Sequence, residues 1–407
     1  MEEPSDWREM LPGLTIGSQL RLRTESRRNA KFDGARPGND EDYLLSRFRF
    51  DLTWQPSDRV AGVVELQDAR IHGERAISET RTLHQAYLDV GSPASGSLPV
   101  SLRIGRQKLV YGSQRMVSPL EWVNTARVFD GARIRVAAGP DRKLDAFATC
   151  LVPVTPTGLN DHGPTGSRMF NSQLHGVYYT DTALVAGATV EGYWLLRRAA
   201  RLDDAVHTIG TRVDTRHGSW AFDAELAAQT GSYGGLDQRA ALVHVGGSHT
   251  TALPGRLTLG TAFNLGSGDD DPADGVHGTF DQLYPLGHAY YGYMDLFALQ
   301  NLRNIEVTAE AALPGRARLR VALQNFALVA PGADAWYNVG GAVVHRSADA
   351  AISSHVGNEL DITIRLPVGP VGLEAGYGRF FGGAYLRDAD FTLDTADFFY
   401  LQTLVGF

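Results

Sequence analysis

Arginine recurs at alternate positions in several segments of this sequence, and apolar residues occupy many of the positions between. In the segment 127–136, RVFDGARIRV, the three arginines share one parity, while valine, alanine and isoleucine share the other. Successive side chains of a β-strand point to opposite faces, so this segment predicts a strand with one cationic and one apolar face. A guanidinium remains charged at working pH and donates two parallel hydrogen bonds to a carboxylate. The pattern therefore indicates recognition of carboxylates or similar anions.

The same alternation appears at 14–27 and 43–55, where arginine opposes leucine, isoleucine and phenylalanine. It returns near the C-terminus in RARLRVAL (316–323) and DITIRL (361–366). We expect these strands to place their arginines on one shared interior face. The arginines predicted on this face are Arg21, Arg23, Arg47, Arg49, Arg103, Arg127, Arg133, Arg135, Arg318, Arg320 and Arg365.

Acidic residues accompany these arginines, and two interpretations of the set are open. Each arginine could brace the interior by pairing with a nearby carboxylate, or it could contact a passing solute. For the set as a whole we expect an excess of positive charge at a constriction, with acidic residues that help a polyanion to move on. The acidic residues predicted on the same lining are Asp130, Glu359 and Asp361.

The elements that carry these faces are short and numerous. Tight turns rich in Gly, Pro, Asp and Ser alternate with longer polar loops along the whole chain, the longer ones including 70–82, 111–125, 230–238 and 266–296. About eighteen strands of roughly 10 to 15 residues fit between these connections, close to the length that a tilted strand needs to cross a bilayer. The fold class predicted is all-β: a transmembrane antiparallel β-barrel with short periplasmic turns and long extracellular loops.

Composition excludes several other classes of protein. No segment approaches the roughly 18 consecutive apolar residues of a membrane helix, and no linker divides the chain, so residues 1–407 are predicted to form one barrel domain. The net charge of −8 disfavours nucleic-acid binding. The single cysteine, Cys150, allows no intramolecular disulfide. The first ten residues, MEEPSDWREM, lack the basic and apolar regions of a signal peptide, so none is expected here.

The C-terminal segment and the aromatic residues favour the outer membrane. DFFYLQTLVGF (397–407) alternates and ends on an aromatic residue, and as an edge strand in water it would be an aggregation hazard. Aromatic residues near strand ends are typical of the girdles at membrane interfaces. Those expected in girdles are Trp54, Tyr111, Trp122, Tyr178, Tyr179, Trp194 and Trp220.

Several strings resemble the alginate-export family of outer-membrane porins. They are GRQKLVYG (105–112), EWVN (121–124), RVFDGARI (127–134), FDQLYP (280–285), YYGYMD (290–295), GNELD (357–361) and GYGRFFGG (376–383). The resemblance spans most of the chain and implies a monomeric eighteen-stranded barrel with an arginine-rich pore. It also adds Arg106, in the GRQ string, to the pore candidates. Arg106 lies off the parity of the other arginines, and a bulge or strand end would have to turn it inward.

Signals for catalysis and for metal binding are poor. The sequence contains no HExxH, G-x-S-x-G or G-x-x-x-x-G-K motif, so we expect a channel and not an enzyme. The loop GSGDDDPADG (266–275) offers oxygen ligands for Ca²⁺ but lacks the EF-hand spacing, and a solvated acidic loop is the favoured interpretation. The candidate ligands are Asp269, Asp270, Asp271 and Asp274. No other cofactor is expected. This longest loop is also the candidate for a lid.

The function expected is passive export of an anionic polysaccharide, an alginate-like uronate polymer, across the bacterial outer membrane. Its partners would be the polysaccharide, outer-membrane lipid and periplasmic export components. Two alternatives are open: a substrate-specific uptake porin for acidic oligosaccharides or small anions, and a structural barrel with a plugged lumen.

Overall fold

A computed structural model describes residues 12–36, 38–73, 77–91, 99–153, 172–199, 204–253 and 255–407. Within these residues eighteen antiparallel strands close into a barrel, as the alternation predicted. The strands of the barrel are β1 (Leu14–Arg28), β2 (Glu41–Ser57), β3 (Val60–Gly73), β4 (Ile77–Val90), β5 (Val100–Gln107), β6 (Phe129–Ala137), β7 (Arg142–Leu151), β8 (Ser172–Asp181), β9 (Ala188–Ala199), β10 (Asp204–His217), β11 (Trp220–Tyr233), β12 (Leu236–Thr250), β13 (Thr258–Gly266), β15 (Leu302–Ala312), β16 (Arg318–Leu328), β19 (His355–Val368), β20 (Val371–Gly382) and β21 (Thr395–Gly406).

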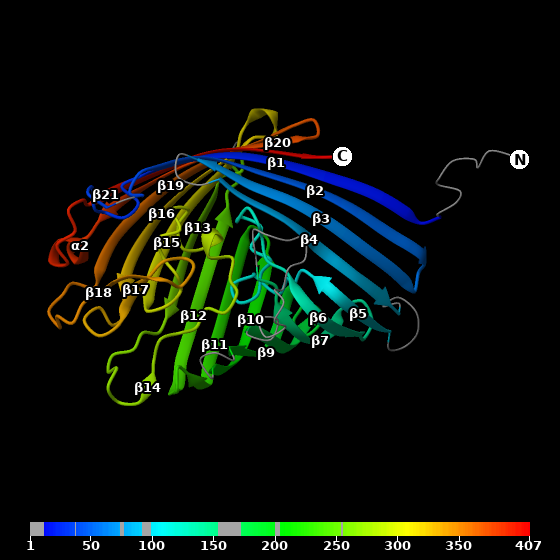
Figure 1. Ribbon diagram of the computed structural model, residues 1–407, viewed down its shortest axis with the longest axis horizontal. Coiled ribbons are helices and arrows are strands. Elements are labelled where there is room, and N and C mark those ends of the chain that lie inside the picture. The colour runs from blue at the N-terminus through cyan, green and yellow to red at the C-terminus, as the bar shows by residue number, and fades with distance from the viewer. Residues whose placement is uncertain are drawn as a thin grey trace, which may run out of the picture.

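The two ends of the sheet meet, so the barrel has no free edge. β1 pairs with β21 in an antiparallel register that runs from Gln19 opposite Gly406 to Arg28 opposite Asp397. Ser18 and Phe407 exchange two backbone hydrogen bonds, of 2.7 and 3.0 Å, beside this seam. Figure 1 shows the blue and red strands side by side. Closure satisfies every strand edge, which a spanning sheet needs in hydrocarbon.

The helices of the described chain are short, and none is long and apolar enough to cross a membrane. The short elements in the connections are β14 (Val276–His277), β17 (Ala335–Tyr337), β18 (Val343–Arg346), α2 (Ala384–Asp388) and the 3-10 helices η1 (Gly287–Ala289) and η2 (Pro314–Arg316). β14, β17, β18 and α2 lie together at one end of the barrel (Figure 1).

The strand faces divide as the sequence pattern indicates. Leu22 in β1 and Phe48 in β2 are exposed on the outer surface, whereas Arg21, Arg23 and Arg47, at the alternate positions, are buried inside the barrel. The register sets Leu20 opposite Phe48 and Arg21 opposite Arg47, and directly opposed residues share a face. An apolar outer face suits contact with lipid, and a polar lumen suits the passage of water and solutes.

Two connections that were expected to be long polar loops are mostly strand. β11 continues to Tyr233 and β12 begins at Leu236, so the expected loop 230–238 is a turn at Gly234 and Gly235. Both glycines have positive φ, 58° and 84°, as a two-residue hairpin turn requires. β3 likewise continues to Gly73, within the expected loop 70–82. Polar residues were read as loop there, but a strand outside the hydrocarbon region can be polar on both faces.

Two long connections fold into the barrel. Residues 108–128, between β5 and β6, will be called the first lumen loop, and residues 267–301, between β13 and β15, the second lumen loop. Val117 of the first loop and Tyr284 of the second form a β-bridge, and both are buried. The girdle expectation is therefore wrong for Tyr111 and Trp122, which belong to the first lumen loop.

The mouth of the barrel carries an aromatic core. Phe297 of the second lumen loop stacks on Phe326 of β16 and on Trp336 of β17, with ring centroids 4.0 and 5.4 Å apart. Phe32, after β1, packs edge-on against Phe380 of β20 with centroids 5.4 Å apart. This packing holds the extracellular connections against the ends of the strands.

Candidate functional site

A cluster of cations surrounds one carboxylate near the middle of the lumen. Glu121, in the first lumen loop, accepts hydrogen bonds from Arg49 NH1 at 2.8 and 3.1 Å and from Arg47 NH1 at 3.0 Å. Lys108 Nζ lies 3.0 Å from its Oε1. We call Arg47, Arg49 and Lys108, with the position occupied by the Glu121 carboxylate, the Glu121 site.

The arginines of the site are themselves held from the barrel wall. Arg49 Nε donates to Gln67 Oε1 in β3 at 2.8 Å, and Arg47 NH2 donates to Gln19 Oε1 in β1 at 3.1 Å. The side chains of Arg47 and Arg49 are only 4% and 5% exposed. Rotamers that are locked by such contacts present their donors in a fixed geometry.

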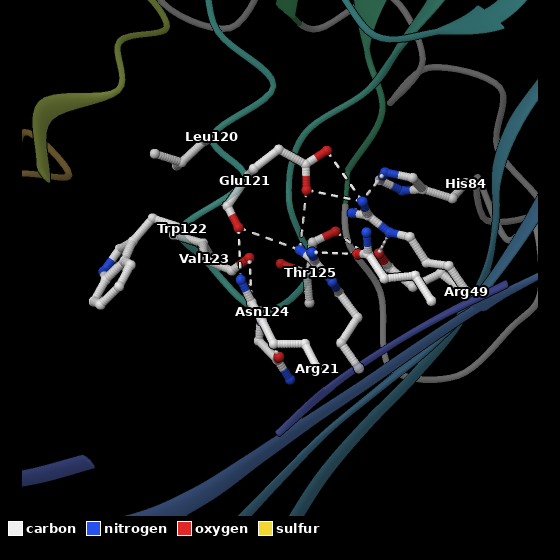
Figure 2. A network of polar contacts seen from close by, with 12 residues as sticks. Arg21, Arg49, His84, Leu120, Glu121, Trp122, Val123, Asn124 and Thr125 are labelled. Atoms are coloured by element: carbon white, nitrogen blue, oxygen red, sulfur yellow. Dashed lines mark hydrogen bonds and ion pairs between the residues drawn. The ribbon is translucent and has the colours of Figure 1, made fainter. Parts of the chain in front are cut away.

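A second pair of arginines holds the backbone of the same loop. Arg21 NH1 donates to the carbonyl of Glu121 at 2.7 Å, and its NH2 donates to Asn124 Oδ1 at 3.1 Å. Arg23 NH1 donates to the carbonyl of Trp122 at 2.9 Å. Figure 2 shows segment 120–125 above the strands, with Arg21 reaching its carbonyl groups and Arg49 reaching the Glu121 carboxylate. The first lumen loop is thereby fixed across the lumen.

The two lumen loops contact each other through a stack of rings. Trp122 stacks on His288, with centroids 3.6 Å apart, and His288 stacks on Tyr293 at 4.7 Å. The guanidinium of Arg23 lies on Trp122 at 3.8 Å. Asp295 accepts from Trp122 Nε1 at 3.2 Å and contacts His288 Nδ1 at 3.0 Å. The stack therefore links β1 to both loops.

Segment 120–125 separates two cavities of different charge. The cavity toward the short turns has a volume of about 690 Å³, and Glu121, Glu310 and Glu374 are its acidic residues. Its cationic lining is formed by Arg21, Arg47, Arg49, Lys108, Arg320 and Arg365. The cavity toward the long loops is about 420 Å³ and is lined by Arg23, Arg27, Glu25, Asp40, Glu41, Asp42 and Asp295. Cations dominate the periplasmic cavity, and carboxylates dominate the extracellular one.

The charge state of Glu121 follows from its neighbours. Burial alone would raise the pKa of this carboxyl, but Arg49, Lys108 and Arg47 outweigh burial and lower the pKa from 4.5 to about 2. Glu121 is therefore ionised at neutral pH. Glu65 is a second carboxylate beside the same cations, with its Oε1 3.4 Å from Lys108 Nζ and 3.7 Å from Arg49 Nε.

Three other predicted arginines lie on the lumen face, and two of them pair with carboxylates. Arg103 bonds Asp89 at 2.6 and 2.7 Å, and Arg135 bonds Asp145 at the same two distances. Arg133 is opposite Arg103 in the register and shares its face. These residues brace the wall near β4 to β7.

The C-terminal arginines lie toward the periplasmic end. Arg320 pairs with Glu306, and Arg365 Nε lies 3.1 Å from Glu374 Oε2. Both arginines line the periplasmic cavity. Arg318, with a side chain that is 70% exposed, lies 3.3 Å from Glu310.

Arg106 and Asp130 lie on the outer face of the barrel, and not on the lining where the sequence placed them. Arg106 is opposite Asp130 in the register and shares the parity of Ile104, whose side chain is 55% exposed. Arg106 Nε and NH2 each lie 2.8 Å from an Asp130 oxygen. The strand keeps its alternation at this point, so no bulge turns Arg106 into the lumen.

Three further predictions are corrected by the loops. Arg127 precedes β6; its NH1 donates to the carbonyl of Ser118 at 3.3 Å, so it fastens the first lumen loop to itself. Glu359 and Asp361 do face inward, but the second lumen loop covers them. Met294 N donates to Glu359 at 2.9 Å, and both carboxylates are fully buried. They hold a loop and do not line open space.

The aspartates of the acidic loop do not gather around a common point. Asp271 Oδ1 accepts the backbone N–H of Ala273, and Asp274 Oδ1 accepts that of Val276. Asp269 and Asp270 line a surface hollow beside β12. Across the described ranges, no group of three or more His, Cys, Asp or Glu side chains is placed to hold a metal ion.

The residues that complete the site lie in loops, where strand parity gives no information. Lys108, Glu121, Trp122, His288 and Asp295 were not predicted as site residues. The signal for all of them except His288 is that GRQKLVYG (105–112), EWVN (121–124) and YYGYMD (290–295) are among the strings that resemble a known family.

Comparison with known proteins identifies that family. The sequence matches the alginate-export family over residues 13–396. The chain belongs to the alginate-export family. A search of curated proteins returned no match.

Solved structures with the same fold include three from Pseudomonas aeruginosa. OccD3 (OpdP) is 12% identical with a TM-score of 0.64, over 98% of this chain and 92% of that protein. The outer membrane protein OprD is 10% identical with a TM-score of 0.64, over 97% and 93%. OccK2 (OpdF) in complex with glucuronate is 12% identical with a TM-score of 0.60, over 97% and 98%. At such identities the likeness shows the fold alone.

Family and fold together give the coarse function. This chain is an outer-membrane porin of the bacterial outer membrane, as the sequence predicted. Membership of this family indicates a channel.

Proposed function

We propose that this porin passes saccharides that carry carboxylates, of the uronate class, through the constriction at the Glu121 site. The observation that carries the proposal is the convergence of Arg47, Arg49 and Lys108 on one carboxylate at about 3 Å. Arginine and lysine donors around one point suit a carboxylate, since each of its two oxygens accepts charge-assisted hydrogen bonds.

The family and one structural relative support the same class of substrate. The family is described by alginate export, and alginate is a polymer of uronic acids. OccK2 was solved in complex with glucuronate, a single uronic acid. The wall of this lumen supplies the cations that either kind of substrate needs.

Entry of a polyanion from the periplasm is the step that the charge distribution favours. The periplasmic cavity is dominated by cations, and the extracellular cavity by carboxylates. A polyanion would concentrate in the first cavity, and the carboxylates of the second would oppose its passage, so export would need a driving force from the periplasm. Movement would be passive and follow a gradient or synthesis in the periplasm.

Uptake of small acidic saccharides is the second candidate, and the size of the cavities favours it. Segment 120–125 divides the lumen into spaces of about 690 and 420 Å³, which is the volume range of pockets for small ligands. A polymer would require this segment to move aside, whereas a monomer or short oligomer requires a smaller displacement.

Single-channel current in a planar bilayer tests the proposal. We expect anion selectivity in a salt gradient, and block by oligouronates at lower concentration than by neutral oligosaccharides of equal length. Oligouronates added on the periplasmic side should block at lower concentration than those on the extracellular side. Cation-selective current, or equal block by neutral sugars, would contradict the uronate proposal while leaving the porin itself intact.

A further inference from the structure

The Glu121 carboxylate is bound in the way that a carboxylate ligand would be. Arg49 NH1 reaches both of its oxygens, and Arg47 and Lys108 each add a contact of 3.0 Å. The side chain of Glu121 is 39% exposed, whereas the two arginines are almost fully buried. The cations are thus part of the wall, and the anion lies at the surface of the periplasmic cavity.

We propose that Arg47, Arg49 and Lys108 form a carboxylate-binding site, and that Glu121 is its internal occupant, which a uronate carboxylate replaces during passage. This inference rests on the proposed function for the identity of the solute. The site itself does not depend on it, because any small carboxylate has the chemistry to fill it.

The site persists without the Glu121 side chain. Arg49 is oriented by Gln67, and Arg47 by Gln19 and by the carbonyl oxygen of Glu121 at 3.2 Å. A site with fixed donors binds an incoming ligand without first paying to order its side chains.

The loop also stays in place when the carboxylate leaves. Its backbone is held by Arg21 and Arg23 at the carbonyls of Glu121 and Trp122. Asn124 Nδ2 donates to the carbonyls of Ser46 and Arg70 at 3.1 and 3.0 Å, and Gln67 Nε2 donates to that of Thr125 at 2.8 Å. None of these bonds uses the Glu121 carboxylate, so this group can be released by rotation of one side chain.

Exchange of one carboxylate for another conserves charge in the constriction. Removal of Glu121 with no replacement would leave three cations close together, with Glu65 contacting only Lys108 and Arg49, and the uncompensated positive charge is costly. If a uronate carboxylate takes the position while the Glu121 carboxylate rotates away, Arg47, Arg49 and Lys108 remain paired with a carboxylate throughout. A tethered competitor acts at an effective concentration of about millimolar or more, which weakens the net affinity for the solute. Conduction needs this combination of attraction and easy release.

The first test replaces Glu121 by alanine and measures the block of current by glucuronate. Loss of the internal competitor should lower the blocking concentration by about tenfold. Glu310→Ala is the matched control, because Glu310 lines the same cavity but pairs with Arg318. It removes the same charge and should change the blocking concentration by less than about threefold, since screening weakens the effect of a distant charge. Equal effects of the two substitutions would overturn the proposal.

Acetate provides a test that does not depend on the uronate hypothesis. In E121A, millimolar acetate should fill the vacant position. Two changes should follow. The barrel should unfold at a higher temperature, as measured by the loss of its compact migration on gels, and the chloride current should fall. The unsubstituted protein should show neither change, because its site is occupied. An acetate effect with no glucuronate block would uphold the site and contradict the proposed substrate. Glucuronate block of the unsubstituted protein with no acetate effect in E121A would overturn the site and uphold the substrate.

A second substitution covers the case in which E121A does not fold. Glu121→Asp keeps the charge but shortens the side chain by one methylene, so it should bind the cations less well. The concentration of glucuronate that blocks the E121D channel should be lower than the concentration that blocks the unsubstituted protein. An unchanged or higher value in E121D would contradict the proposal.

Discussion

Trp122 and His288, one from each lumen loop, lie parallel with their ring centroids 3.6 Å apart and 10° between their planes. Asp295 contacts the ring nitrogens of both, at 3.2 and 3.0 Å. This contact is one of the points at which the two loops hold each other, together with the β-bridge between Val117 and Tyr284. Movement of either loop must therefore break the stack.

Truncation of Trp122 should loosen both loops. Ring stacking contributes about 0.5–1.5 kcal/mol beyond burial, so W122A should raise the frequency of brief openings by about two- to tenfold. W122F keeps a ring but loses the bond to Asp295 and should lie between. W194A serves as the control, because Trp194 is exposed on the outer face of β9. Single-channel recording measures all three variants. An unchanged frequency of openings in W122A would show that the stack of Trp122 on His288 does not hold the loops closed.

Acid should release the Glu121 side chain from its cations, with the loop backbone still held, only at low pH. The pKa of Glu121 is lowered from 4.5 to about 2, so its ion pairs are complete above about pH 4.5 and are lost as the pH falls through about 2. The pKa of Asp295 is lowered too: burial raises it, but His288 and Arg27 outweigh burial. We expect constant conductance from pH 7 to 5 and a rise below about pH 3. A midpoint near pH 5 in the bilayer recording would contradict this assignment.

Loss of one arginine of the Glu121 site should weaken block by uronates. Hydrogen bonds to charged groups contribute about 1.5–3 kcal/mol, so R47A should raise the blocking concentration of an oligouronate roughly tenfold or more. R318A removes the same charge at an exposed position near the periplasmic end and should have little effect. Similar shifts in R47A and R318A would show that general charge, and not the site, governs block.

Gly292 is required where the second lumen loop crosses β19. Its φ is +89°, and a Cβ there would lie 2.6 Å from both oxygens of the Glu359 carboxylate. Gly275, in the same loop, has a φ of +83° with open space around it, so G275A isolates the backbone cost of about 1–2 kcal/mol. G292A should destabilise the loop by more than this. Urea unfolding of the two variants in detergent measures the difference, and equal stabilities would exclude a clash.

The barrel could be predicted from the sequence because its constraint is local. A strand that separates lipid from water must alternate apolar and polar side chains. Leu22 beside Arg21 and Phe48 beside Arg47 show this alternation in the sequence. The same rule failed for Tyr233 and Leu236, where strands extend with polar residues on both faces. No apolar face is needed there, so the sequence carries no sign of the strand.

The site could be predicted only in part, because half of it is brought in by loops. Parity placed Arg47 and Arg49 on the lumen, but their partner Glu121 comes from a connection whose path is set by tertiary contacts. Arg106 and Asp130 show the opposite error. A family resemblance suggested a place in the pore for Arg106, and Asp130 was expected among the lumen carboxylates, but the strand register gives neither residue that place. Glu359 and Asp361 face inward as the alternation implies, and only the second lumen loop reveals that they are covered.

Arg21 and Arg23 hold segment 120–125 by its carbonyl oxygens, which every amino acid possesses. The bonds that Arg21 and Arg23 make therefore do not depend on the side chain at position 121, whereas the side chains of Trp122 and Asn124 take part in the anchoring. A protein engineer could exchange the residue at position 121 for an amide, a hydroxyl or a basic group and retune what the porin admits, with the scaffold left as it is. Position 121 is thus an exchangeable selectivity position on a scaffold that the exchange leaves unchanged.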